Sequence, residues 1–220
     1  MQTPLDVIRT VSSQDEMVFP GQEESYFQIG ERAIELVNMA LTICGRKRLP
    51  RILDLPCGHG RVLRWLRAQF PYAEITACVD FCAAQFGAIG TYSNPDLEQV
   101  EFPAPFDLVW CGSLLTHLPL GAQLKVLDKL IEWTREDGIL IFSLQGRFLA
   151  SQLERGQADF ADNVDVVGLL RDFRRDGAAY RPYMESQMGG YGLALNSPEY
   201  LTSLIKKNAS GILRAYFEQA

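Results

Sequence analysis

The sequence predicts an α/β fold with a doubly wound, mostly parallel sheet. Short apolar runs alternate with amphipathic segments between residues 51 and 145, which is the pattern of successive βαβ units. One of these runs, Phe106–Cys111, is apolar over nearly its whole length, as is typical of a strand covered on both faces. The length of 220 residues, 47% of them apolar, suits one or two domains and suffices for a buried core.

An N-terminal arm followed by a helix is expected ahead of this core. Residues 1–28 are polar and interrupted by prolines and a glycine, so this stretch predicts an arm. Apolar residues then recur at helical spacing from Gly30 to Cys44, and Gly45 with the basic residues that follow supplies the signals that end a helix. The arm and the helix together occupy residues 1–50.

Residues 51–146 are predicted to form the α/β core. A helix is expected at residues 61–70, where Arg61, Arg64 and Arg67 share one face and predict a solvated surface. The other elements expected here are a helix that begins at Pro119, a turn at Asp137–Gly138, and strands at residues 51–55, 74–79, 88–93, 106–111 and 139–144.

Two further segments follow the core. The pattern weakens over residues 147–196, and an irregular stretch of this length is typical of a lid or a binding insert. It leaves from the carboxyl end of the fifth strand, where ligands bind in such sheets, so we expect it to cover the acceptor site. Residues 197–220 are predicted to hold a closing helix at 198–206 and a last strand at 212–217.

Composition limits the class of partner. The chain has 21 basic and 27 acidic side chains, a net charge of −6, which argues against nucleic acid or an anionic membrane as the main partner. The five cysteines are an odd number and lie mostly in apolar runs, which predicts reduced thiols. No run is apolar enough to span a bilayer, and no signal peptide is recognisable. The expected location is the cytoplasm.

The first predicted strand is followed by a glycine-containing turn. Gly58 and Gly60 lie between the strand and the next helix, where open α/β sheets bind ligands. A dinucleotide-binding turn would have a third glycine at the position of Leu63. Asp54 would place a negative charge near bound phosphates, so a ligand with a cationic centre fits this turn better.

Four stretches of the sequence resemble the class I S-adenosylmethionine-dependent methyltransferases. They are RILDLPCGHG (51–60), ITACVD (75–80), FDLVWCGSLLTHL (106–118) and GILIFS (138–143). The resemblance covers residues 51–145 and implies a Rossmann-like sheet with S-adenosylmethionine across the carboxyl ends of its strands. The family ends with an antiparallel strand pair, whereas few residues follow 212–217 here. We therefore expect either a shortened sheet or a chain that continues past residue 220.

The resemblance implies which residues bind S-adenosylmethionine. The turn after the first strand would face its methionine and ribose parts, the acid after the second strand its ribose hydroxyls, residues 94–97 its adenine, and the end of the fourth strand its sulfonium. The cofactor-binding residues carried over in this way are Asp54, Pro56, Cys57, Gly58, His59, Gly60, Asp80, Asp96, Cys111, Gly112 and Ser113.

Two features depart from the family. Pro56 stands where the family usually has a glycine, and Asp80 comes one residue later than the usual ribose-binding acid, with an unusually short helix at 81–88. Either Asp80 binds the ribose from a tightened turn, or a few residues, including the true acid, are absent between Cys78 and Asp80.

The candidate catalytic residues are His117 and Arg147, with a structural role for His117 as the alternative interpretation. No metal site is expected, because Cys78 and Cys82 have no second ligand pair at metal spacing. The expected function is methyl transfer from S-adenosylmethionine to a small-molecule or glycan-like acceptor. The alternatives are a non-catalytic binding or scaffold protein of the same fold and, disfavoured by Leu63, a nicotinamide-dependent oxidoreductase.

Overall fold

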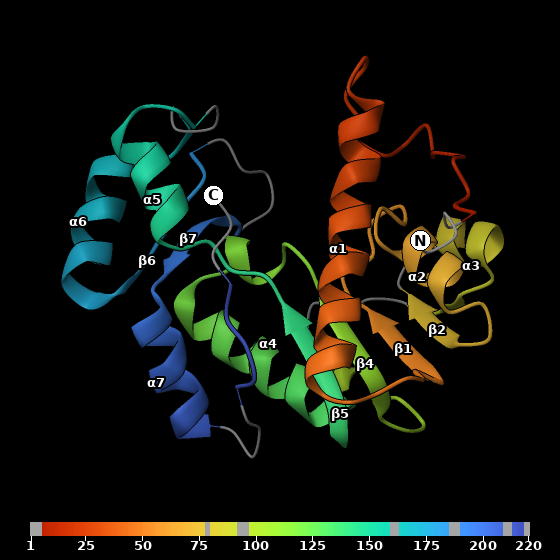
Figure 1. Ribbon diagram of the computed structural model, residues 1–220. Helices are drawn as coiled ribbons and strands as arrows, with labels where there is room; N and C mark the ends of the chain where they lie inside the picture. The colour runs from red at the N-terminus through yellow and green to blue at the C-terminus, as the bar shows by residue number, and fades with distance from the viewer. Residues whose placement is uncertain are drawn as a thin grey trace. The chain divides into compact units, whose positions relative to one another are not determined.

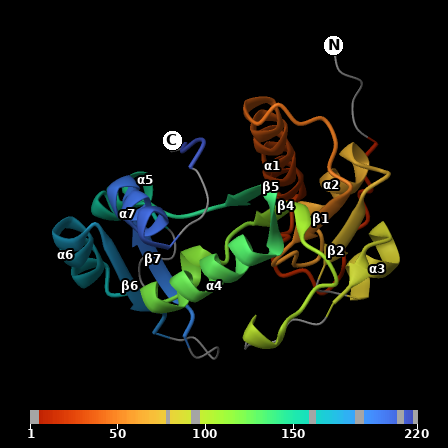
Figure 2. The same cartoon turned by 90° about the horizontal axis from the view of Figure 1, so that it is seen from below.

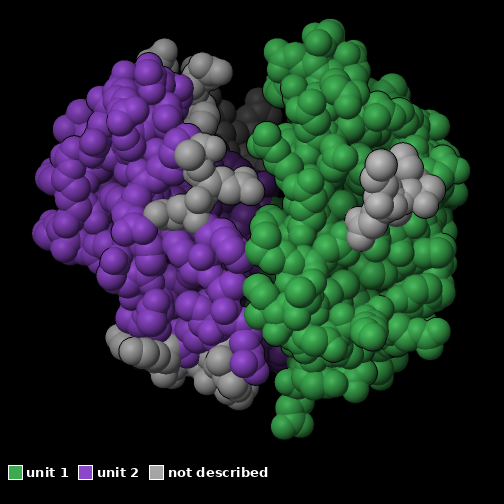
Figure 3. All heavy atoms as spheres, in the orientation of Figure 1, with its two compact units in different colours: residues 1–112, 133–141 green, residues 113–132, 142–220 purple. Residues whose placement is uncertain are grey.

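The structure is a computed structural model that describes residues 6–77, 80–91, 97–158, 163–184, 190–208 and 213–217 (Figure 1). The chain divides into two compact units, coloured separately in Figure 3: unit 1 holds residues 1–112 and 133–141, and unit 2 holds residues 113–132 and 142–220. The boundaries of these two units do not coincide with those of the four segments expected from the sequence.

Unit 1 is built on a five-stranded sheet with the order β3-β2-β1-β4-β5. Figure 2 labels β2, β1, β4 and β5 of this sheet. Strand β1 pairs in parallel with β2 and β4, and β2 pairs in parallel with β3. All six residues of β4 are buried, which explains why this strand is apolar along its length. The strands are β1 (Arg51–Asp54), β2 (Glu74–Ala77), β3 (Ile89–Gly90), β4 (Phe106–Cys111) and β5 (Thr134–Phe142). The predicted α/β class is therefore confirmed, with a shortened sheet.

Three helices belong to unit 1: α1 (Glu23–Ile43), α2 (Leu63–Gln69) and α3 (Asp80–Phe86). A short 3-10 turn, η1 (Leu97–Gln99), precedes β4. Helix α1 approaches α2 at Gly30, where a Cβ atom would come closer than 3.0 Å to the Arg61 carbonyl oxygen and the Trp65 ring. Glycine is therefore required at this crossing. Helix α3 has seven residues, so the short helix expected after the second strand is confirmed.

Unit 2 combines helices with a two-stranded antiparallel sheet. Strands β6 (Ala178–Pro182) and β7 (Gly192–Asn196) pair along their whole lengths, and all five residues of β7 are buried. The helical elements are η2 (Leu115–His117), α4 (Leu120–Trp133, of which Trp133 belongs to unit 1), α5 (Arg147–Glu154), α6 (Val166–Asp176) and α7 (Pro198–Asn208).

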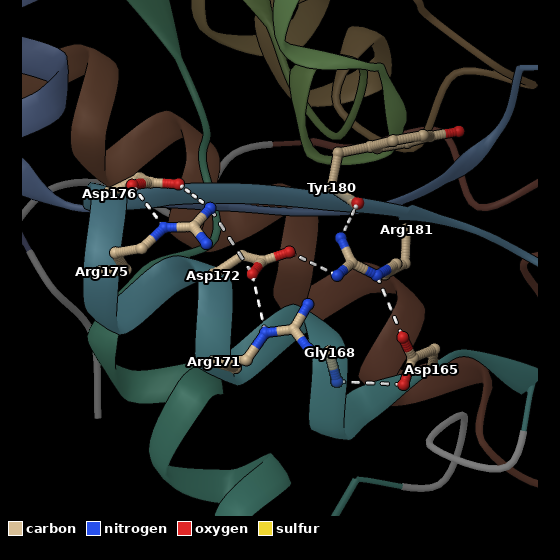
Figure 4. A network of polar contacts seen from close by, with 8 residues as sticks. All are labelled: Asp165, Gly168, Arg171, Asp172, Arg175, Asp176, Tyr180 and Arg181. Carbon is tan, nitrogen blue, oxygen red and sulfur yellow. Dashed lines mark hydrogen bonds and ion pairs between the residues drawn. The ribbon is translucent and has the colours of Figure 1, made fainter.

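A network of charged side chains joins α6 to β6 (Figure 4). The Asp165 side chain caps the helix by accepting from the Gly168 amide at 3.0 Å. Arg181 of β6 donates to both Asp165 and Asp172. Hydrogen bonds from Arg171 and Arg181 lower the pKa of Asp172 to about 2. The acids of α6 are thus neutralised by neighbouring arginines, and this surface carries little unpaired charge.

The structure corrects two element boundaries. Helix α1 begins at Glu23 and not at Gly30, because Tyr26 and Phe27 extend its buried face into the stretch expected to be arm. Strand β5 begins at Thr134, so the turn expected at Asp137–Gly138 lies inside the strand. The exposed start of this edge strand carries charged residues, and Arg135 there pairs with the Asp107 carboxylate at 2.8 Å.

Two stretches outside the core also differ from expectation. Residues 147–196 contain α5, α6, β6 and β7 rather than an irregular insert, so their weak pattern concealed regular elements. The strand expected at residues 212–217 is wrong for residues 213–217, which are exposed and form neither helix nor strand. A short apolar run does not by itself select a strand unless a partner edge is available.

Candidate functional site

Asp54 is the last residue of β1 and lies at the carboxyl edge of the unit 1 sheet. It is paired in register with Ala77 of β2 and Trp110 of β4, and it is only 1% exposed. Neither carboxylate oxygen has a hydrogen-bond partner within the described part of the chain. Burial and the nearby Cys57 raise the pKa of Asp54 well above its ordinary value, although Arg61 opposes this shift. Burying a carboxyl group without a hydrogen-bond partner is energetically costly, and a cationic group of a ligand would be such a partner.

The turn that follows Asp54 brings backbone to the same edge of the sheet. Gly58 and Gly60 have φ angles of +50° and +86°, in the left-handed region that favours glycine. A Cβ atom on Gly58 would meet no atom within 4 Å, so a ligand can approach the backbone there. At Gly60 a Cβ atom would collide with the Phe86 ring of α3. One glycine therefore leaves room for a ligand, and the other allows α3 to pack against the turn.

Three cysteines are buried around this acid. The Cys57 and Cys82 sulfurs both lie near the Gly58 carbonyl oxygen, at 3.3 and 3.4 Å. The hydrogen bond between Cys82 and Cys57 and then burial raise the pKa of Cys82, whereas burial and the charge of Asp54 raise the pKa of Cys111 to about 12. The Cys82 and Cys111 thiols are therefore protonated at neutral pH, and all three cysteines pack as small apolar side chains. Among the described residues, no group of three or more His, Cys, Asp or Glu side chains could hold a metal ion.

The other residues expected to bind cofactor are distributed along this edge. His59 is half-buried, Pro56 is exposed after a cis peptide bond from Leu55, and Asp80 is the exposed first residue of α3. Asp96, the bond between Cys78 and Val79, and residues 94–96 of the expected adenine-binding stretch lie outside the described residues. The roles of His59, Pro56 and Asp80 stay predictions.

The end of β4 reaches the same edge. Cys111 is fully buried, and Gly112 and Ser113 follow the strand directly. Ser113 has a φ angle of +61°, the one positive φ of a non-glycine residue in the described ranges, and its amide donates to the Ser143 hydroxyl at 2.8 Å. A strained backbone of this kind persists where the surroundings fix it and is frequent at ligand sites.

His117 lies in unit 2, at the end of η2. Its Nδ1 atom is 3.0 Å from the Gly192 carbonyl oxygen and 3.1 Å from the Tyr183 hydroxyl. A carbonyl oxygen can only accept, so Nδ1 carries the proton and, in the neutral ring, Nε2 carries the lone pair. The ring stacks on Tyr191, with centroids 5.7 Å apart and planes 10° apart. No described residue is hydrogen-bonded to Nε2. Arg147, the other catalytic candidate, is the exposed first residue of α5.

One expectation about α2 is wrong, and the error hid a residue of the site. Arg64 is not on a solvated face: it is 1% exposed, and its guanidinium donates to backbone carbonyls. Arg67 is half-buried and donates to carbonyls of Phe86 and Ala73. The three-residue spacing could not distinguish a solvated arginine from one whose donors are used inside the fold. The available signal was the irregular N-terminal arm, because backbone carbonyls outside helices and strands need donors from elsewhere in the fold.

A parallel sheet whose first strand ends in a buried acid and a glycine turn defines a cofactor-binding α/β protein. The chain belongs to the methyltransferase domain family, which it matches over residues 26–178. It therefore carries an S-adenosylmethionine-dependent methyltransferase domain, as the resemblance implied. No helix in the described ranges is long and apolar enough to cross a membrane.

Relatives of known function match part of the chain. A malonyl-[acyl-carrier protein] O-methyltransferase of Bacillus anthracis is 31% identical over 105 residues, which are 44% of this chain and 38% of that protein. The protein of the same name from Acetivibrio thermocellus is 25% identical over 138 residues, which are 59% of this chain and 47% of that protein. The match thus spans less than half the length of either relative.

Solved structures agree on the fold. An S-adenosylmethionine-dependent methyltransferase from Clostridium acetobutylicum has a TM-score of 0.53 and 14% identity, covering 79% of this chain and 78% of that one. A Burkholderia thailandensis 1,6-didemethyltoxoflavin-N1-methyltransferase has a TM-score of 0.52 and 14% identity, covering 85% and 68%. At these identities the likeness extends to the fold alone.

Proposed function

We propose that this protein transfers a methyl group from S-adenosylmethionine to the oxygen of a small-molecule acceptor. The observation that carries the proposal is Asp54, a buried acid without a hydrogen-bond partner among the described residues, next to the accessible backbone of Gly58. The residues at this edge fit the cofactor, because its methionine part carries an ammonium group that can donate a hydrogen bond to the Asp54 carboxylate. The names of the two curated relatives, both O-methyltransferases, support oxygen as the acceptor atom.

Each residue of the cofactor site has a binding task. Asp54 would hold the ammonium group, the backbone of the turn at residues 57–60 would contact the methionine and ribose parts, and Asp80 would accept from the ribose hydroxyls. When bound, the cofactor supplies a methyl group already activated by a positive sulfonium. The protein therefore has to orient the donor and exclude water, and strong acid or base catalysis is required only by the acceptor.

His117 is the proposed general base for a hydroxyl acceptor. The Gly192 carbonyl fixes the proton on Nδ1, so Nε2 can accept the proton that the acceptor oxygen must lose. Tyr191, stacked on the ring, and Tyr183, hydrogen-bonded to it, hold its orientation. Arg147 would bind a negatively charged part of the acceptor.

Ligand-dependent stability tests the cofactor. S-adenosylhomocysteine at 100 times its dissociation constant is expected to raise the free energy of unfolding by about 2.7 kcal/mol. NAD at the same concentration is expected to leave it unchanged, because Leu63 replaces the third glycine of a dinucleotide turn. Thermal unfolding with each ligand measures both effects. Stabilisation by NAD alone would favour an oxidoreductase, and no stabilisation by either ligand would contradict the proposed function.

Substitution of His117 tests the base. His117→Asn keeps a donor near the Gly192 carbonyl but has no basic nitrogen at the Nε2 position, so turnover is expected to fall about 100-fold or more with unchanged S-adenosylhomocysteine affinity. The assay measures S-adenosylhomocysteine released on incubation with a low-molecular-weight metabolite extract. Tyr183→Phe is the matched control, since the Gly192 carbonyl still fixes the tautomer. Full activity of His117→Asn would indicate an acceptor that needs no base, such as a carboxylate, and no release by the wild type would favour a non-catalytic binding protein.

A further inference from the structure

Arg64 connects parts of unit 1 that are far apart in the sequence. It lies in α2 and is 1% exposed. Its Nε atom donates to the Gly60 carbonyl at 2.9 Å, and one terminal nitrogen lies 3.4 Å from the His59 carbonyl. The side chain thus holds the last two carbonyl groups of the turn that follows β1.

The same guanidinium binds the N-terminal arm, residues 6–22. Its other terminal nitrogen donates to the carbonyls of Ile8 at 3.0 Å and Thr10 at 3.1 Å. The terminal nitrogen near the His59 carbonyl also donates to the Tyr26 hydroxyl at 3.3 Å, and that hydroxyl donates to the Asp15 carboxylate at 2.7 Å. The arm is therefore attached to Arg64 both directly and through Tyr26.

These contacts compensate the burial of a charge. An arginine presents five N–H donors in a fixed plane, and a buried guanidinium is costly unless those donors are used. The rings of Phe27 and Phe86 lie 5.2 Å from the Arg64 guanidinium carbon and add a favourable cation–π contact. Removing the arm would leave two donors of a buried cation without their carbonyl partners.

The turn needs support of this kind. Gly58 and Gly60 both have positive φ angles, and glycine reaches such angles without being confined to them. Ordering a glycine turn around a ligand costs conformational entropy unless other contacts have already fixed it. The Arg64 hydrogen bonds to the His59 and Gly60 carbonyls fix the turn before a ligand binds.

We infer that Arg64 is a positioning residue through which the N-terminal arm holds the cofactor turn in its binding conformation. Arm docking and cofactor binding then stabilise each other, because a coupling between two binding events is reciprocal. The inference rests on the proposed function only in naming S-adenosylmethionine as the ligand of the turn.

Hydrogen exchange of the full chain tests the coupling. The amides of residues 6–22 are measured by mass spectrometry with and without S-adenosylhomocysteine, whose affinity is determined by calorimetry. In Arg64→Lys the single ammonium group cannot reach both sets of carbonyls, so exchange in the arm is expected to rise about tenfold and affinity to fall about tenfold. Bound S-adenosylhomocysteine is expected to slow arm exchange in the wild type and to lose this effect in Arg64→Lys.

Arg67→Lys is the matched control, because Arg67 lies one turn further along α2 and donates to the carbonyls of Phe86, Ala73, Gly87 and Pro71, none of them in the arm or the turn. It is expected to lower the melting temperature without changing the ligand-dependent protection of the arm. Tyr26→Phe leaves Arg64 and its hydrogen bonds to the Ile8 and Thr10 carbonyls in place and removes the hydroxyl that links Arg64 to Asp15, so it tests the coupling even if Arg64→Lys fails to fold. It is expected to accelerate arm exchange about fivefold.

Three results would overturn the inference. They are unchanged arm exchange in both Arg64→Lys and Tyr26→Phe, arm release without loss of S-adenosylhomocysteine affinity, and equal effects of Arg64→Lys and Arg67→Lys on the ligand-dependent protection. Failure of the proposed function is distinguishable: a wild type that binds no S-adenosylhomocysteine would overturn the choice of ligand, whereas ligand-free exchange would still decide whether Arg64 holds the arm.

Discussion

Replacement of Gly30 by alanine is expected to lower the free energy of unfolding by about 3 kcal/mol. The new methyl group would lie closer than 3.0 Å to the Arg61 carbonyl oxygen, and backbone cannot give way as a flexible side chain can. It would also meet the ring of Trp65, a residue that is 9% exposed and packed in the core of unit 1. Helices α1 and α2 would have to separate to make room.

Gly121→Ala is the control for helix propensity. Gly121 also lies in a helix, α4, but a Cβ atom there would meet nothing within 4 Å. Alanine is therefore expected to stabilise the protein at this position by about 0.5–1 kcal/mol. Urea unfolding of both variants separates propensity from packing. Equal effects of the two substitutions would show that the α1–α2 crossing is not as close as described.

Gly30→Ala is also expected to displace the cofactor turn. Arg61 follows Gly60 directly, so a displaced Arg61 carbonyl moves the end of the turn. The affinity of Gly30→Ala for S-adenosylhomocysteine should therefore fall under conditions where the variant is still folded. Gly121→Ala should bind as the wild type does.

The α/β core was predictable because its strands are buried on both faces. Runs such as Phe106–Cys111 are apolar throughout, and the turn after Asp54 carries glycines where backbone must adopt positive φ angles. Both signals are local in the sequence. They identify the sheet and place the cofactor turn at its carboxyl edge without knowledge of distant contacts.

What could not be predicted depends on contacts between distant residues. The burial of Arg64 is compensated by carbonyls of Ile8 and Thr10, more than fifty positions earlier, and no spacing within α2 reveals them. The early start of β5 likewise carries a tertiary contact that the local pattern does not reveal, the ion pair of Arg135 with Asp107. Sequence patterns alone predict that charged side chains are exposed to solvent. Such a side chain is buried only where residues distant in the sequence supply its partners.

The affinity for S-adenosylhomocysteine is expected to depend on pH through Asp54. The charged and titratable groups that influence this acid, or are influenced by it, are Cys57 of the turn, Arg61 before α2, Cys82 of α3 and Cys111 of β4. Burial dominates over the favourable charge of Arg61, so the pKa of Asp54 in the ligand-free protein lies well above its ordinary value of 3.8. The acid is protonated over a pH range in which an exposed aspartate is ionised.

The raised pKa of Asp54 makes the ligand-free protein less stable as the pH rises. Below pH 3.8 Asp54 is protonated in the folded and unfolded states, and it contributes no difference. As the pH rises above that value the unfolded chain releases the proton and the folded chain retains it, so the stability of the ligand-free protein falls by up to about 1.4 kcal/mol per pH unit. The loss stops at the folded pKa. Asp54→Asn has no titrating group, so it should be more stable than the wild type at neutral pH.

A bound ammonium group reverses the preference of Asp54, because the ionised carboxylate is then the better partner. Binding should release a proton below the folded pKa, and S-adenosylhomocysteine affinity should rise with pH by up to about tenfold per unit and then level off. Calorimetry in two buffers of different ionisation enthalpy measures the released proton directly. Asp54→Asn should bind more weakly, about 100-fold at the plateau, and without a pH slope. The matched ligand is 5′-methylthioadenosine, which lacks the amino-acid part and should bind both proteins equally at every pH. A pH-independent affinity of the wild type, or equal pH slopes for the two ligands, would mean that Asp54 does not hold the ammonium group.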